Sequence, residues 1–375
     1  METEIRKVQS AGYVTVTVSL PRNWVKLNGI KPGDRVSVVT EDDGSLRILP
    51  EVPEGRKVVF SCVVDAEKCS EPGLLPRVIA GLYITGQERF AVRSKRPLSE
   101  EQTKGLRELA DRLIGMGIVE ETPTLFSLQS FVDPTKYPVH HLLRRIYSIT
   151  AGMLNGVVRA LNEGEKVYAE QAVKMEDEAD KIYWLVVRQL LLAAKNPAVA
   201  AKIGVASPLH LLGNRVVAKA LEEIGDRLQA VALETISILN RLGGKEATGL
   251  REITAFAQRV RALYDKVVKA FSTLNISLAN EVIAEASAFE RDEVSLTSHA
   301  LTEAHTRICE ACVGAVGGGP PRGLIMTQVV TAAELRAAIW NLAQVARHCK
   351  TIAEITINRG LESPSVYVLE QSEPM

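Results

Sequence analysis

Acidic residues at helical spacing are the part of this chain that could do chemistry. Glu176 and Asp180 stand four residues apart, at the edge of the apolar stripe of a helix predicted over residues 165–195, and Asp177 follows Glu176 directly. Two carboxylates one turn apart on a helix face repel each other unless a cation lies between them. The pattern therefore predicts a counter-charge at this point of the helix.

A second acidic pair lies on the next long helical pattern, over residues 208–242. Glu222 and Asp226 are again four residues apart, and Gly225 would allow a close approach of two helices. If the two helices pack antiparallel, the acids of both could converge on one hard cation with oxygen ligands, such as Mg²⁺, Mn²⁺ or iron. The alternative is two solvated acidic faces that pair with basic neighbours on the same helices. Those neighbours are Lys174, Lys181, Arg215 and Lys219.

Length and composition indicate a multidomain protein whose net charge does not favour binding to a polyanion such as DNA. The 375 residues allow two or three domains, and the 45 basic and 45 acidic residues cancel. The five cysteines are too few and too scattered for a disulfide framework, so we expect free thiols in a reducing compartment. There is no signal-peptide pattern, and the longest apolar runs are too short for a membrane span. We expect a cytoplasmic protein without direct membrane insertion.

Residues 1–50 predict a small β unit. β-branched residues are dense between Tyr13 and Leu20, a short helix follows Pro21, and Pro32-Gly33 occupies the central positions of a type II turn. Two further strands, joined by an Asp43-Gly44 hairpin, complete the unit. So small a unit cannot bury a good core, and we expect a second copy to complete it.

The order LPRNWVKLNGIKPGDRVSVV, then DDGSLRILP, resembles the SpoVT/AbrB swapped-hairpin family. The resemblance implies a homodimer formed through this domain, with basic residues facing DNA. The matching positions are Arg6, Lys7, Arg22 and Lys26. Seven basic against six acidic residues leave the domain nearly neutral, so DNA binding requires its positive charges to share one face. A purely dimerising role is the alternative.

Residues 58–132 alternate between strand and helix patterns in the order βαβαββ, which indicates a small α+β domain. Nothing in it has the spacing of a catalytic or cofactor motif. A rigid spacer or a small regulatory-ligand domain are the two interpretations of its role.

Six helical patterns follow, and their periods suit two three-helix bundles, over residues 138–242 and 246–360, before a tail at 361–375. The stretch GAVGGGPPRG between the last two helices lacks the Lys-Ser/Thr of a phosphate loop, which favours a connector. The duplicated bundle, with acids on its second helix and LEEIGD on its third, resembles PhoU, the phosphate-uptake regulator. Together with the N-terminal resemblance, the whole chain resembles the archaeal PhoU-like regulators.

The PhoU resemblance implies a metal cluster held by an E(D)xxxD motif. Its residues here are Glu176, Asp177 and Asp180, with Glu222 and Asp226 at the acidic positions of the third helix. The metal would be a divalent or trivalent ion, namely iron, Mg, Mn or Zn.

The second bundle departs from this pattern. Its acids are Glu290, Asp292 and Glu293, but Val294 or Ser295 replaces the closing Asp and Arg347 stands where an acid is usual. A cation there repels a metal and can neutralise the carboxylates itself. We expect an Arg–carboxylate pair in place of a metal.

A zinc site built from His305, Cys309 and Cys312 with His348 and Cys349 is a weaker possibility, because it needs two helices to bring the ligands together.

The function that these patterns favour is a non-enzymatic, metal-binding regulator of phosphate homeostasis. Its implied partners are a phosphate ABC transporter or a sensor protein, and DNA. The alternatives are a metal-dependent phosphoesterase, or a DNA-binding structural or antitoxin-like protein.

Overall fold

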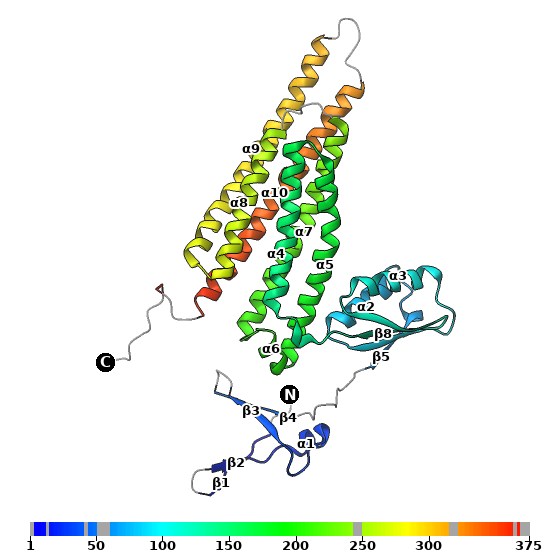
Figure 1. Ribbon diagram of the computed structural model, residues 1–375, viewed down its shortest axis with the longest axis vertical. Coiled ribbons are helices and arrows are strands. Elements are labelled where there is room, and N and C mark those ends of the chain that lie inside the picture. The colour runs from blue at the N-terminus through cyan, green and yellow to red at the C-terminus, as the bar shows by residue number, and fades with distance from the viewer. Residues whose placement is uncertain are drawn as a thin grey trace. The chain divides into compact units, whose positions relative to one another are not determined.

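The computed structural model describes residues 4–12, 15–40, 44–50, 61–242, 250–314, 322–362 and 366–367. The chain divides into two compact units, residues 1–59 and 60–375 (Figure 1). The first is the small β unit, and the second contains both the α+β domain and the helices.

The N-terminal unit contains two antiparallel strand pairs and one short helix. β1 (Gln9–Ala11) pairs with β2 (Thr15–Thr17), α1 (Arg22–Asn28) follows, and β3 (Val36–Thr40) pairs with β4 (Leu46–Pro50). β2 is shorter than predicted, because Val18–Leu20 have no strand beside them in the described part of the unit.

Two glycines of this unit, Gly29 and the predicted turn residue Gly33, have the backbone that only glycine adopts readily. α1 ends at Gly29 with φ 63°, and Gly33 has φ 97° while the Asp34 amide donates to the Lys31 carbonyl at 3.0 Å. The latter is the hydrogen bond of the predicted turn. The hairpin predicted at Asp43-Gly44 and the linker predicted at 51–57 involve residues outside the described ranges.

This unit leaves much of its apolar surface uncovered. Six large apolar side chains are at least half exposed, and Ile5 reaches 97%. The six are Ile5, Val8, Val16, Val18, Val38 and Leu46. None of the described side chains of the unit is buried, so these residues form no core within a single copy.

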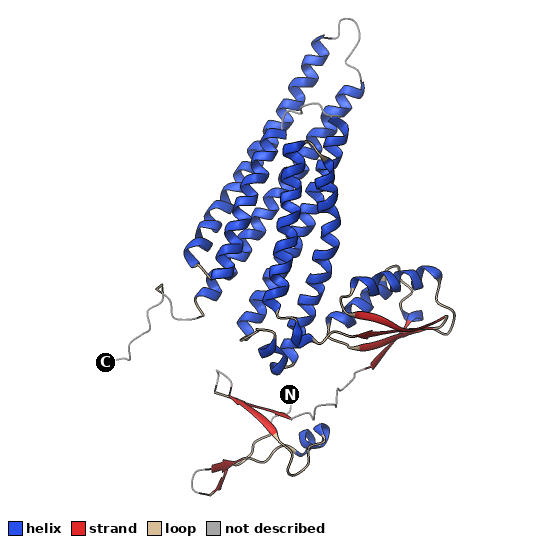
Figure 2. Cartoon of the chain, viewed as in Figure 1, coloured by secondary structure: helices blue, strands red, loops and turns tan. Residues whose placement is uncertain are grey.

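The α+β domain has the predicted βαβαββ order. Its elements are β5 (Ser61–Asp65), α2 (Leu74–Ile84), β6 (Arg89–Arg93), α3 (Glu100–Arg112), β7 (Met116–Thr122) and β8 (Leu125–Ser130). The sheet order is β5-β6-β8-β7, with β5 and β6 parallel and the other pairs antiparallel. Both helices cover one face of the sheet (Figure 2). Ser99 caps α3 in a reciprocal capping box with Gln102, which fixes where that helix begins.

The helical region contains the six predicted helices and one more. The first bundle comprises α4 (Val139–Glu163), α5 (Lys166–Lys195) and α7 (Pro208–Leu242), and the second α8 (Leu250–Thr273), α9 (Ile276–Gly314) and α10 (Arg322–Gly360). The additional helix is the short α6 (Pro197–Lys202), where the sequence predicted only a break; Asn196 caps it by accepting from the Ala198 amide at 3.0 Å.

The two bundles share one hydrophobic core. Buried side chains from α4, α5, α7, α8, α9 and α10 form a single contiguous cluster. At its centre, Tyr264 of α8 forms a hydrogen bond of 2.6 Å with Thr150 of α4, and Cys349 of α10 is buried. No helix among the described residues combines the length and apolarity that a membrane span needs.

Candidate metal centre

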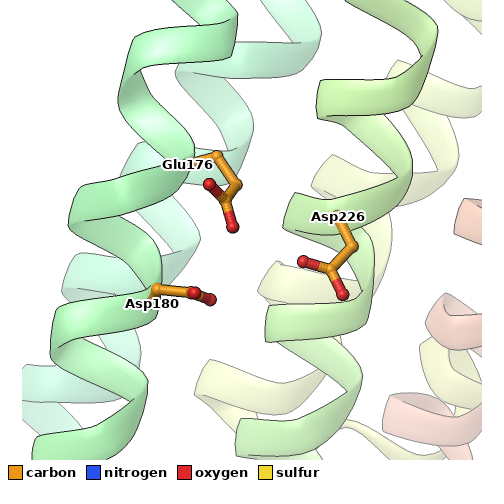
Figure 3. A group of neighbouring side chains, drawn as sticks. All are labelled: Glu176, Asp180 and Asp226. Atoms are coloured by element: carbon orange, nitrogen blue, oxygen red, sulfur yellow. The ribbon is translucent and has the colours of Figure 1, made fainter. Parts of the chain in front are cut away.

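Helices α5 and α7 bring acidic side chains from both predicted pairs together. The short α6 reverses the chain, so the two long helices run antiparallel and their acidic turns lie opposite each other. Figure 3 shows Glu176 and Asp180 of α5 pointing toward Asp226 of α7. One carboxylate oxygen of each lies within 4.8 Å of the others, and we call these three residues the acidic trio.

A second group shares Asp226 with the trio. Glu222, Glu223 and Asp226 also offer oxygens within 4.8 Å of one another. Glu223 was not among the predicted ligands, although its spacing of three residues from Asp226 in LEEIGD could have found it. Two adjacent cation positions would thus have one carboxylate in common.

Asp177, the remaining predicted residue of the motif, belongs to neither group. Its side chain is 71% exposed, and its nearest cation is the Arg112 guanidinium at 3.9 Å. Because it follows Glu176 by one residue, the helix turns it about 100° away from the trio.

Burial and mutual repulsion make these carboxylates hard to ionise together. Burial, followed by the charges of Asp180, Asp226 and Asp177, raises the pKa of Glu176 from 4.5 to about 7, while Arg112 opposes the rise. Burial, with Glu222 and Asp180 next, raises the pKa of Asp226 from 3.8 to about 6. A bound cation would remove both penalties.

Three side-chain cations already contact the two acidic groups, the weakest contact being that of Arg227 with Glu223 at 3.5 Å. Nη2 of Arg112, the last residue of α3, donates to Oδ2 of Asp180 at 3.1 Å. Nζ of Lys219 lies 2.5 Å from Glu222 and 2.8 Å from Glu223. In the described part of the chain Asp226 has no cation within ion-pair distance, and Glu176 accepts a neutral hydrogen bond from Gln229 at 2.9 Å.

The residues fit a hard metal ion. The donors of the trio are all carboxylate oxygens, which suits Mg²⁺, Mn²⁺ or iron better than the nitrogen and sulfur donors typical of structural zinc sites. Burial first, and then the neighbouring carboxylates, raise the pKa values of Glu176 and Asp226, and a bound cation would oppose both effects. Gln229 would orient Glu176 through its existing hydrogen bond.

The second bundle arranges its acids differently. Arg347 of α10 lies 3.2 Å from Glu290 of α9, and Arg259 of α8 lies 2.7 Å from Asp292. Glu293 belongs to neither acidic group. The predicted Arg347–carboxylate pair is therefore present.

The predicted zinc ligands do not converge. Cys309 and His305 lie 3.7 Å apart on the exposed side of α9, whereas Cys349 is buried in the core. No third His, Cys or carboxylate oxygen joins them among the described residues. Helix packing turns Cys349 inward, toward Tyr264 rather than toward α9's exposed face, so the structure does not support this weaker possibility.

The four predicted DNA-facing residues are all exposed. Arg22 and Lys26 lie one turn apart on α1, so they share a face of that helix, and Arg6 pairs with Glu4. Lys7 follows Arg6 in the segment before β1.

Two family models match the chain. Residues 143–235, which run from α4 into α7 and include the trio, match the PhoU domain. We refer to these residues as the PhoU domain, after the family model that they match. Residues 15–56 match the model described as antidote-toxin recognition MazE, bacterial antitoxin. The predicted resemblances are thus confirmed for the N-terminal unit and the first bundle, and the resemblance of the second bundle to PhoU stays a prediction.

Among solved structures, that of PhoU from Pseudomonas aeruginosa is similar, with 19% identity and a TM-score of 0.47 over 59% of this chain and 96% of that one. None of the curated proteins matches the chain. The sequence alone placed Glu176, Asp180, Glu222 and Asp226 and named Lys219 as a possible partner, whereas Glu223 and, from the α+β domain, Arg112 were identified by the structure.

Proposed function

We propose that this chain is a non-enzymatic regulator of phosphate uptake whose PhoU domain binds a metal ion. One observation carries the proposal: Glu176, Asp180 and Asp226 of that domain converge with oxygens within 4.8 Å. The metal would supply the positive charge that lets three carboxylates ionise side by side, and would so fasten α5 to α7. Phosphate uptake as the regulated process follows from the PhoU resemblance.

An adaptor suits this site better than a phosphoesterase. A metal hydrolase needs open coordination positions together with basic side chains free to bind the substrate phosphate. The side-chain cations that contact the cluster, Arg112, Lys219 and Arg227, are instead engaged by its own carboxylates. The chain would therefore act through a protein partner, for which we propose a phosphate ABC transporter or a sensor protein.

The N-terminal unit supports a second role. Its MazE-type match and uncovered apolar side chains favour a homodimer formed through residues 1–50. Exposed Arg22 and Lys26 on one face of α1 favour DNA as a ligand of that dimer. The protein would then couple phosphate status to transcription.

Metal content of purified protein tests the first proposal. We expect wild-type protein to retain Mn²⁺ or iron through gel filtration, and Asp226→Asn and Glu176→Gln to lose it. Asp177→Asn is the matched control, because Asp177 lies in the same motif but outside the trio. Equal metal content in all four proteins would refute the site.

Two cellular and solution measurements test the remaining parts. Deletion should alter phosphate uptake, and Asp177→Asn but not Asp226→Asn should restore it. Arg22→Ala with Lys26→Ala should weaken duplex binding and reduce its salt dependence by about one counterion per lost phosphate contact. Unchanged salt-dependent binding would restrict the N-terminal unit to dimerisation.

A further inference from the structure

The α+β domain packs against a single stripe of α5. The α5 residues that contact it lie three or four positions apart, which is the spacing of one helix face. They include Asp177, Asp180, Trp184, Arg188, Leu192 and Lys195. The acidic end of the stripe is also the metal-binding face of the PhoU domain.

The end of the stripe far from the trio is held by donors to backbone carbonyls. Buried Arg188 donates to the carbonyls of Tyr83 and, at 3.1 Å, Gln87, where α2 ends. Lys195 donates to the carbonyl of Thr85 at 2.6 Å. A side chain at Gly86 would clash with Leu192, since an added Cβ would lie 2.6 Å from its Cδ2. These contacts involve no carboxylate and would not respond to a metal.

At the end near the trio, Arg112 is the charged side chain of the α+β domain that pairs with α5 among the described residues; it contacts Asp180 and, at 3.9 Å, Asp177. Its guanidinium lies 3.1 Å from Asp180 and 5.2 Å from the ring centre of Trp184, so it is both paired and stacked. Its buried Nε has no hydrogen-bond acceptor in the described part of the chain. The contact therefore depends on the negative charge of Asp180 rather than on a complete set of hydrogen bonds.

We propose that Arg112 is the counter-charge of Asp180 in the metal-free protein, and that a metal ion displaces it and releases the α3 end of the α+β domain from α5. The inference depends on the proposed metal site. A guanidinium and a hard metal ion that share one carboxylate repel each other in a half-buried site, so each weakens the other's contact with Asp180. Arg188 and Lys195 keep the α2 end in place, so the domain tilts rather than dissociates.

The coupling must act in both directions. If metal binding weakens the Arg112 contact, the Arg112 contact weakens metal binding by the same factor. Docking of the α+β domain would thus set the metal concentration at which the PhoU domain becomes occupied. The domain that the sequence suggested as a spacer would be the part of the protein that reports metal occupancy.

Mn²⁺ titration of the full-length chain by calorimetry tests the coupling. We compare wild type with Arg112→Gln, which keeps hydrogen-bond donors but removes the charge, and with Arg112→Lys, which keeps a positive charge. Arg107→Gln is the control, since Arg107 lies on the same helix but pairs with Glu121 inside the α+β domain at 2.5 Å. Arg112→Gln should bind Mn²⁺ about tenfold more tightly than wild type, and the other two within about threefold.

Hydrogen exchange gives a readout that does not depend on affinity. In wild type, Mn²⁺ should speed amide exchange in the last turn of α3 and leave exchange at the end of α2 unchanged. In Arg112→Gln, the last turn of α3 should exchange fast with or without metal. Wild-type binding with no gain in Arg112→Gln would overturn this inference and leave the metal site intact. Absence of Mn²⁺ binding by wild type would overturn both.

Discussion

Arg347 of α10 lies 3.2 Å from Glu290 of α9, on the helices of the second bundle that correspond to α7 and α5 of the first. The same guanidinium also donates to the side chain of Gln344 at 3.2 Å. One bundle thus neutralises its acid with a residue of its own, whereas the other leaves Asp226 without a cation within ion-pair distance in the part that the structure describes. The two bundles have corresponding helices, but they differ in how their acidic residues are neutralised.

Replacing Arg347 should therefore have little effect on metal binding. Arg347→Ala removes an ion pair whose two side chains are both about half exposed, so we expect a loss of unfolding free energy below about 1 kcal/mol. The metal content per chain should equal that of wild type. Urea denaturation and elemental analysis check both values, and a loss of metal would mean that the second bundle contributes ligands.

The stability of the metal-free protein should fall as the pH rises from about 4 to about 7. The folded-state pKa of Glu176 is raised to about 7 and that of Asp226 to about 6, so the folded state holds protons that the unfolded state has released. Stability from these groups is complete below the unfolded pKa values and is lost as the pH passes the folded ones.

Thermal melts with a chelator present measure this slope. Glu176→Gln cannot lose a proton, so its melting temperature should fall less than that of wild type between pH 5 and pH 7.5. Added Mn²⁺ should reverse the wild-type trend, because the metal binds the ionised carboxylates. Parallel melting curves for the two proteins without metal would argue against the raised pKa of Glu176.

Arg188 should be the strongest single contact between the α+β domain and the helices. Arg188→Met keeps an apolar chain of similar length but removes two charge-assisted hydrogen bonds, to Tyr83 and Gln87. Such bonds contribute about 1.5–3 kcal/mol each, offset in part by the relief of burying a charge, so we expect a net loss of about 2 kcal/mol. Lys174→Met, at an exposed position on the same helix, is the control. Arg188→Met should unfold at a lower urea concentration than Lys174→Met. Equal unfolding midpoints would contradict the role of Arg188 as the strongest contact.

Helical periodicity was sufficient to predict the long helices. The pattern over 165–195 became α5 (Lys166–Lys195), and that over 208–242 became α7 (Pro208–Leu242). Each buries a wide apolar stripe, which the sequence shows directly. The short α6 was missed, since six residues hold too few turns to display a period.

The sequence could predict those residues of the candidate site that lie within one turn of each other on the same helix. Spacing placed Glu176 and Asp180 on one face, and the antiparallel packing of α5 and α7 brought Asp226 to them; their role as metal ligands stays a prediction. Arg112 could not be found in this way. It lies 68 residues from Asp180 and belongs to another domain, and nothing in its neighbourhood indicates where that domain docks.

Gly156 and Gly225 should respond to alanine in opposite directions. The sequence suggested Gly225 as the point of close helix approach, yet a Cβ there would lie 3.7 Å from Thr150 and 3.9 Å from Ala179, which is ordinary contact. Gly225→Ala should therefore stabilise α7 by about 0.5–1 kcal/mol through helix propensity.

The close approach lies instead between α4 and α5. A Cβ on Gly156 would lie 2.8 Å from the backbone carbonyl of Tyr168, which cannot move unless the helices separate. Gly156→Ala should cost about 1–3 kcal/mol, as overpacking does in other cores. Urea denaturation of both variants checks the signs. Because Gly225 precedes Asp226, retained metal in a stabilised Gly225→Ala would also show that α7 presents its carboxylate without needing a flexible turn.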